Sequence, residues 1–152
     1  MLLVLVGIGQ DTYVIPARDV LEIAPDSAAT TIPDAPQGVI GLICYRGRIM
    51  PLLDLGELCR SAACASTPTT RILVVQSKGS RGANGLIGIR AERITSTARM
   101  DEMAFRSPGI AAAPYVTGIT VDSRRGIIQR LDLHCLLDQN AAVLFAEELI
   151  GG

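Results

Sequence analysis

Short apolar stretches separated by turn-forming residues dominate the sequence and predict a β-rich fold. The stretches are rich in Leu, Ile and Val and are bounded by Gly, Pro, Asn or Ser, as strands of small all-β proteins are. The expected strands cover residues 2–8, 12–15, 20–23, 37–45, 48–53, 71–76, 86–90, 116–121 and 126–131. Arg46-Gly47 and Asn84-Gly85 are turn dipeptides between neighbouring stretches, so they indicate hairpins.

Helical patterns are few. One helix is expected near the C-terminus, over residues 140–150, with Gly151 as its stop signal. Short helical turns are expected at 55–60, 101–105 and 133–137. Asp54 and Asp132 each follow an apolar strand and precede such a turn, so each is expected to cap the N-terminus of the turn.

An internal repeat organises the chain. The segment 35–55 (APQGVIGLICYRGRIMPLLDL) returns at 113–133 (APYVTGITVDSRRGIIQRLDL), and the segment 17–20 has a looser copy at 91–94. Two copies of a strand-rich unit of about 75 residues suggest two small barrels packed together, because closing a short-stranded sheet removes its exposed edges. The region 61–70, rich in Ala, Ser and Thr, separates the copies.

The expected organisation is therefore one domain, residues 1–152, with two lobes. The lobes cover approximately residues 1–65 and 66–140, with exchange of strands between them left open.

Composition narrows the classes of function. The chain has 152 residues, 49% of them hydrophobic and 3% aromatic, with a net charge of −1. A nucleic-acid or anionic-membrane binder needs a basic stripe, which this sequence lacks. No apolar run reaches the length of a membrane span, and the N-terminal MLLVLVGIG has no basic leader, so we expect a cytoplasmic protein without membrane insertion and with reduced cysteines.

Candidate catalytic groups are sparse. His134 is the only histidine and adjoins Cys135, but neighbouring side chains on a strand point to opposite faces. Cys59 and Cys64 lack the spacing of a structural zinc site. We therefore expect no catalytic residue, no metal and no cofactor; an enzyme that uses Cys135 and His134, or Asp54, is the less favoured alternative.

Two charges are harder to assign. Glu22 interrupts the apolar stretch VLEI, and Arg46 lies at the turn of a hairpin with apolar arms. A charge on the wet face of a barrel explains both, and so does an arginine at a protein interface. The local sequence around Glu22 and Arg46 favours neither interpretation over the other.

The succession YVIPARDVLEI, TIPDAPQGVIGLICYRGRIMPLLDL, LIGIRAERITS, YVTGI and RGIIQRLDL resembles the CheW-like domain, from about residue 3 to 137. This domain is the coupling protein of bacterial chemosensory arrays and the regulatory domain of the histidine kinase CheA. The resemblance implies an all-β fold of two five-stranded SH3-like barrels around a shared core. It also implies an adaptor, not an enzyme, that contacts the cytoplasmic tip of a chemoreceptor and the regulatory domain of a CheA-type kinase.

Family contact positions match Val20, Glu22, Gly41, Arg46 and Ile49 in this sequence. The chain departs from the family where Cys44-Tyr45 replaces a usual Asn-Leu and where Arg90 replaces a common Asp. The hypothesis of an accessory or non-flagellar pathway rests on these substitutions. The resemblance itself implies recruitment to membrane-associated receptor arrays. A small SH3-like barrel that binds another partner, such as nucleic acid, is the alternative.

Overall fold

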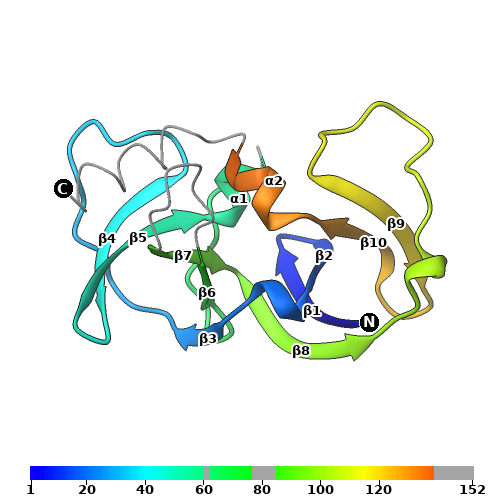
Figure 1. Cartoon of the computed structure of the whole chain (residues 1–152), viewed down its shortest axis with the longest axis horizontal. Helices are drawn as coiled ribbons and strands as arrows, with labels where there is room; N and C mark the ends of the chain where they lie inside the picture. The colour runs from blue at the N-terminus through cyan, green and yellow to red at the C-terminus, as the bar shows by residue number, and fades with distance from the viewer. Residues whose placement is uncertain (60–61, 77–84, 139–152) are drawn as a thin grey trace.

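The computed structural model describes residues 1–59, 62–76 and 85–138, which form two five-stranded β-sheets side by side (Figure 1). Lobe A has the strand order β8-β1-β2-β10-β9. Its strands are β1 (Leu2–Ile8), β2 (Asp11–Pro16), β8 (Arg93–Arg99), β9 (Val116–Asp122) and β10 (Gly126–Leu131). Lobe B has the order β3-β6-β7-β5-β4. Its strands are β3 (Glu22–Pro25), β4 (Val39–Tyr45), β5 (Arg48–Asp54), β6 (Arg71–Gln76) and β7 (Leu86–Ala91).

The nine expected strands are confirmed, and one strand was missed. Strand β8 pairs with β1 along one edge of lobe A. Its sequence, RITSTAR, has a single large apolar residue, Ile94, so it lacks the apolar alternation that marks a half-buried strand. Pairing with the buried strand β1 compensates for this weak local preference, because strand propensity depends strongly on the neighbouring strands.

Each lobe contains strands from both copies of the repeat. Shifting each strand number of lobe A by five, with the count returning to one after ten, gives the order of lobe B, so the two sheets have the same topology. The expected lobes 1–65 and 66–140 correspond to the sequence copies, and strands are exchanged between these copies in the two sheets, which the sequence analysis left open. The physical reason is the parallel pairing of β10 with β2 and of β5 with β7, because parallel neighbours need a crossover connection. The chain crosses between the lobes after β2 and again after β7.

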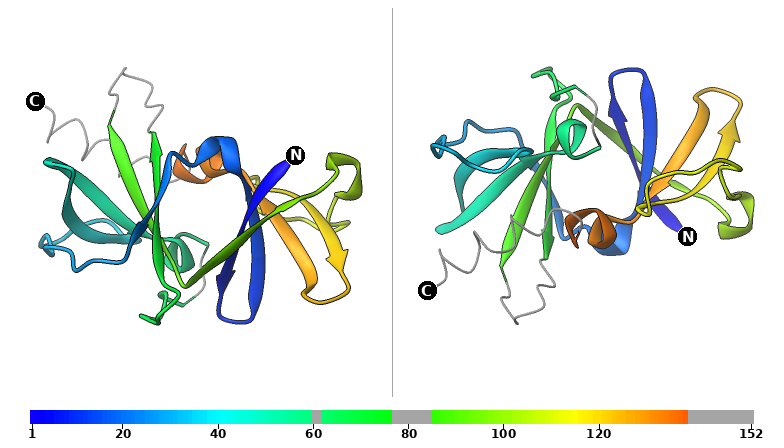
Figure 2. Two further views of the ribbon diagram at one scale, coloured as in Figure 1. Left: turned by 90° about the horizontal axis from the view of Figure 1, so that it is seen from below. Right: turned by 90° about the horizontal axis from the view of Figure 1, so that it is seen from above.

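The lobes share one hydrophobic core. Its largest cluster combines β1, β2 and β10 of lobe A with β5, β6 and β7 of lobe B. The repeated Leu-Asp-Leu sequence ends in this cluster, where Leu53, Leu55, Leu131 and Leu133 are buried. Burying one such side chain contributes about 1.5–3 kcal/mol. The lobes are therefore held together by side chains from both copies of the repeat. Figure 2 shows the two sheets side by side from two further directions.

The described residues include three short helical elements between strands, η1 (Ala17–Asp19), α1 (Leu55–Leu58) and η2 (Glu102–Ala104), and one after the last strand, α2 (Leu133–Asp138). The carboxylate of Asp54 accepts a hydrogen bond from the Glu57 N–H at 3.1 Å, and that of Asp132 accepts one from the Cys135 N–H at 3.1 Å. Both predicted N-caps, and the three predicted helical turns, are confirmed. The helix predicted over 140–150 lies outside the described residues.

Candidate interaction surface

The turn of hairpin β4–β5 holds an arginine in an unfavourable backbone conformation. Tyr45 pairs with Arg48, so Arg46 and Gly47 form a two-residue turn, and both have positive φ, 50° and 77°. Such a turn matches the twist of the strands but favours Asn or Gly at its first position. A left-handed conformation at a non-glycine residue costs about 1–3 kcal/mol and is a reason to look for function.

Arg46 reaches from this turn to the edge strand β3. Its Nη2 lies 2.7 Å from Oε1 of Glu22, and its guanidinium lies 5.3 Å from the ring centroid of Tyr45. The structure thus brings together the two charges that the sequence analysis singled out. The Arg46 side chain is 71% exposed, and an ion pair of this kind contributes about 0–1 kcal/mol to stability. Both charges are therefore within reach of a partner.

Exposed apolar side chains occur on the same hairpin and the same edge strand as the ion pair. Ile49 is 64% exposed and lies opposite the exposed Cys44 in the hairpin. The sequence analysis missed Leu21 and Ile23, which are 59% and 42% exposed. Their apolar character gave no sign of exposure, which follows from the facing of the strand: Ala24 packs in the lobe B core, so its sequence neighbour Ile23 points outward. We call Leu21, Glu22, Ile23, Arg46 and Ile49 the lobe B surface.

Val20 and Gly41, the other two predicted contact residues, are less exposed. Val20 is partly buried against the shared core, and its N–H donates to the Ala17 carbonyl at 3.1 Å. Gly41 is buried beside Thr30, which exchanges two backbone hydrogen bonds with Leu42. A Cβ on Gly41 would lie 2.2 Å from the Thr30 carbonyl oxygen, so only glycine fits. Neither residue is therefore part of the exposed surface.

The unusual Arg90 is explained by a local anchor. Its Nε donates to Oδ1 of Asp26 at 2.9 Å, and its Nη2 donates to the Ser27 carbonyl at 3.0 Å. Arg90 is in β7, whereas residues 26 and 27 follow β3. The arginine therefore fixes the segment that leads from β3 toward Thr30, and this supports the lobe B surface.

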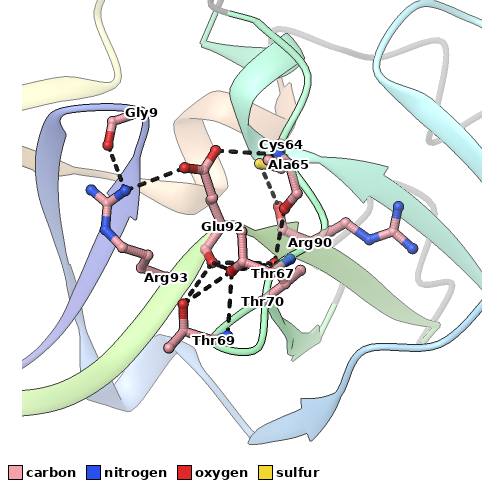
Figure 3. A network of polar contacts seen from close by, with 9 residues as sticks. All are labelled: Gly9, Cys64, Ala65, Thr67, Thr69, Thr70, Arg90, Glu92 and Arg93. Carbon is pink, nitrogen blue, oxygen red and sulfur yellow. Dashed lines mark hydrogen bonds and ion pairs between the residues drawn. The ribbon is translucent and has the colours of Figure 1, made fainter.

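The crossover after β7 is held by a polar network (Figure 3). Three hydroxyls, those of Thr67, Thr69 and Thr70, donate to the Glu92 carbonyl at 3.2, 3.4 and 3.2 Å. The Glu92 carboxylate accepts from the Ala65 N–H at 3.2 Å, and Arg93 donates to the Gly9 carbonyl. Since Gly9 lies in lobe A and residues 65–70 lead into lobe B, these contacts tie the lobes together at the crossover.

The thiols and the imidazole do not converge on one place. His134 Nε2 lies 3.7 Å from Oδ1 of Asp19. Burial raises the pKa of Cys59 to about 11 and that of Cys64 to about 12, which leaves both as neutral, weakly reactive thiols at pH 7. Across 1–59, 62–76 and 85–138, no group of three or more His, Cys, Asp or Glu residues could hold a metal ion.

These features define a two-lobed protein whose distinctive side chains lie on an outer surface. The chain matches the CheW-like domain family over residues 2–141 and belongs to that family. In the part that the structure describes, no helix has the length and apolar character needed to cross a membrane.

Two curated relatives and one solved structure are similar to this chain. The chemotaxis protein CheW of Helicobacter pylori (strain ATCC 700392 / 26695) is 30% identical over 95 residues, 62% of this chain and 54% of the relative. Protein FrzA of Myxococcus xanthus is 27% identical over 110 residues, 69% of this chain and 64% of the relative. The chain thus spans less than two thirds of either relative.

The crystal structure of the scaffolding protein TtCheW from Thermoanaerobacter tengcongensis superposes with a TM-score of 0.76 at 23% identity. The superposition covers 89% of this chain and 86% of TtCheW. The predicted fold of two SH3-like barrels is thereby confirmed.

Proposed function

We propose that this protein is a non-enzymatic adaptor of a bacterial chemosensory system, coupling a chemoreceptor to a CheA-type histidine kinase. Membership of the CheW-like family and the similarity to a chemotaxis protein CheW support the class of function. The observation that carries the proposal is the exposed Arg46–Glu22 ion pair between the β4–β5 hairpin and strand β3, which also carry the exposed apolar residues Ile49 and Ile23. Arginine beside apolar groups is enriched at protein interfaces and often supplies much of the binding energy.

The adaptor acts through geometry and not through turnover. It holds receptor and kinase in a fixed relation, so that a change in the receptor shifts the kinase between its active and inactive populations. A shared core and the polar crossover suit this role, since both resist relative movement of the lobes. Such a protein works in the cytoplasm, where it is recruited to membrane-associated receptor arrays.

The proposed contact residues divide into two groups. Glu22, Arg46 and Ile49 touch the receptor tip or the kinase regulatory domain directly. Val20 and Gly41 contribute by placing the strands beneath them, since Val20 packs on the shared core and Gly41 accommodates the Thr30 backbone.

Charge reversal at Arg46 tests the proposal. We expect Arg46→Glu to reduce binding of a receptor cytoplasmic fragment or of the kinase regulatory domain at least tenfold, because it places two carboxylates together at the interface. The midpoint of urea unfolding should change little, since the ion pair is exposed. Binding is measured by calorimetry with proteins from the native host, and Arg125→Glu on the other hairpin is the matched control.

The double variant Glu22→Arg with Arg46→Glu distinguishes a direct contact of these charges with the partner from a structural role of the ion pair within the protein. It restores the ion pair within the protein but exchanges its two ends. If partner binding stays weak, the charges contact the partner as proposed. If binding returns in full, or if Arg46→Glu unfolds the protein, the pair has a structural role and the contact assignment is wrong.

We further propose that the pathway is accessory or non-flagellar. Cys44-Tyr45, at the position of a usual Asn-Leu, lies next to Arg46 and changes the rim of the lobe B surface. Cys44 is exposed there, and Tyr45 lies against the guanidinium. Restoration of swimming chemotaxis in a strain without its ordinary coupling protein would contradict this part.

A further inference from the structure

Strand β9 is the outer strand of lobe A, and part of its outer edge is unpaired. Ile119 exchanges two backbone hydrogen bonds of 2.8 Å with Arg106 on that edge. Because the direction of the backbone groups alternates along a strand, the N–H and C=O of Val121 point to the same outer edge as those of Ile119. Neither has a partner there among residues 1–59, 62–76 and 85–138. If the antiparallel ladder continued past the bridge between Arg106 and Ile119, Ala104 would pair with Val121. The N–H of Ala104 instead donates to the Asp101 carbonyl.

A notch of about 480 Å³ lies at this edge. It is lined by Ala104, Arg106, Ser107, Ile119, Thr120 and Val121. The short two-bond bridge between Arg106 and Ile119 forms one end of the notch, and the hairpin turn after Asp122 lies beyond the other. An extended segment placed here would continue the ladder that the bridge begins.

The surroundings of the notch are apolar and positive. Val121 and Ile127 form an opposed pair on the hairpin and are 75% and 63% exposed. Arg106 is the one charged residue of the notch lining, and its guanidinium has no hydrogen-bond or ion-pair partner in the described part of the chain. Asp122 is already occupied, since Arg125 Nη1 lies 2.7 Å from its Oδ2.

We propose that the β9 edge binds an extended, acidic and apolar segment of a partner protein by strand addition. The backbone of Val121 supplies the ladder hydrogen bonds, Val121 and Ile127 accept the apolar side chains, and Arg106 pairs with a carboxylate. This site is separate from the lobe B surface, because β9 and β4 lie at opposite ends of the molecule (Figure 1). It lets the adaptor hold a third segment while the lobe B surface is engaged.

Peptide titration of the full chain tests the proposal. The probe is a synthetic heptapeptide that alternates Val and Asp, and its control replaces each Asp with Lys. We expect the acidic peptide to bind at least tenfold tighter, and the amide hydrogen of Val121 to become protected from exchange when it binds. Equal affinity for both peptides, or protection confined to other strands, would overturn the proposal.

Two variants and one matched control locate the contact. Arg106→Glu should reverse the charge preference without disturbing its backbone bridge. Val121→Pro removes the outward N–H at an edge position, where proline is tolerated, and should weaken peptide binding about tenfold or more. Cys44→Pro makes the same change at the corresponding edge of lobe B and should leave binding unchanged. Loss with Cys44→Pro but not with Val121→Pro would refute the site.

A second copy of the chain is the competing occupant. Sedimentation of the peptide-free protein distinguishes it. A dimer that Val121→Pro dissociates would show that the edge pairs with another copy and would overturn the acidic-segment proposal. A monomer at the same concentration supports it.

Discussion

Hairpin β4–β5 of lobe B and hairpin β9–β10 of lobe A are built alike but carry different side chains. Gly41 pairs with Leu52 in the first, and Gly118 pairs with Arg130 in the second, each next to a register shift. At the tips they diverge. Arg46 reaches across to another strand, whereas Arg125 pairs with Asp122 of its own hairpin. Two hairpins of the same backbone design therefore differ in their ion pairs. In lobe B the arginine at the tip contacts strand β3, and in lobe A it contacts a residue of its own hairpin.

The edge strands explain the divergence. Glu22 of β3 pairs with Val74 in β6, and Ser96 of β8 holds the equivalent place opposite Leu5 in β1. The edge strand β8 therefore offers no carboxylate, at the place equivalent to Glu22, to an arginine at the tip of the lobe A hairpin. The apolar Ile23 likewise corresponds to Thr97. The two lobes thus have the same topology but different side chains on their edge strands and hairpin tips. For this reason we assign the proposed receptor and kinase contacts to lobe B.

The largest difference is expected between the two hairpin glycines. A Cβ at Gly41 would lie 2.2 Å from a backbone oxygen, whereas a Cβ at Gly118 would lie 3.0 Å from the Phe105 Cβ. Gly41→Ala should lower the free energy of unfolding by about 3 kcal/mol or more, and Gly118→Ala by about 1–2 kcal/mol. Urea unfolding followed by circular dichroism measures both. Equal losses would show that the segment around Thr30 moves as readily as Phe105.

A smaller difference is expected between the two capping aspartates. Asp54 is 3% exposed, and its carboxylate accepts hydrogen bonds from the N–H groups of Glu57 and Cys64. The carboxylate of Asp132 accepts a hydrogen bond from the N–H of Cys135. We expect Asp54→Ala to cost about 2–3 kcal/mol and Asp132→Ala about 1 kcal/mol, since each lost bond to a buried donor adds to the cost. Thermal unfolding of both variants under one buffer condition tests this order.

Sequence patterns predicted the positions of the strands better than they predicted which strands belong to which lobe. Nine strands, the Arg46-Gly47 turn and the Asp54 and Asp132 caps follow from local chemistry, which a sequence displays directly. The exchange of strands follows from the parallel pairs β2–β10 and β5–β7, and parallel pairing leaves no local signal because its partners are far apart in the chain. Strand β8 was missed for the related reason that its stability comes from β1.

The residues of the lobe B surface could be predicted from the sequence only in part, because their arrangement also depends on strand pairing. Glu22 and Arg46 are conspicuous in the sequence as charges among apolar residues, but that they pair depends on the closure of lobe B. Leu21 and Ile23 look like core residues until the facing of β3 is known. Gly41 matches a family motif, and only the backbone of Thr30 shows why a side chain is excluded there.

The smallest expected difference concerns the thiols near the two capped turns. Burial raises the pKa of Cys64, near Asp54, from its ordinary value of 9.0 to about 12, and also raises the pKa of Cys135, next to Asp132. A thiol with a raised pKa in the folded protein stays protonated there after the unfolded chain has begun to ionise. Its stabilising contribution is complete below pH 9 and is lost progressively between about pH 9 and 12.

Replacement of Cys64 by Ser should therefore flatten the fall in unfolding free energy above pH 9 more than replacement of Cys135 does. We expect a difference of at most about 1 kcal/mol at pH 10, allowing for the partial exposure of Cys64. Urea midpoints at pH 7, 9 and 10 measure it, and the values at pH 7 remove any change unrelated to ionisation. If Cys135→Ser flattens the curve equally, the environments of the two capped turns are alike, and the contrast between the lobes is confined to their outer surfaces.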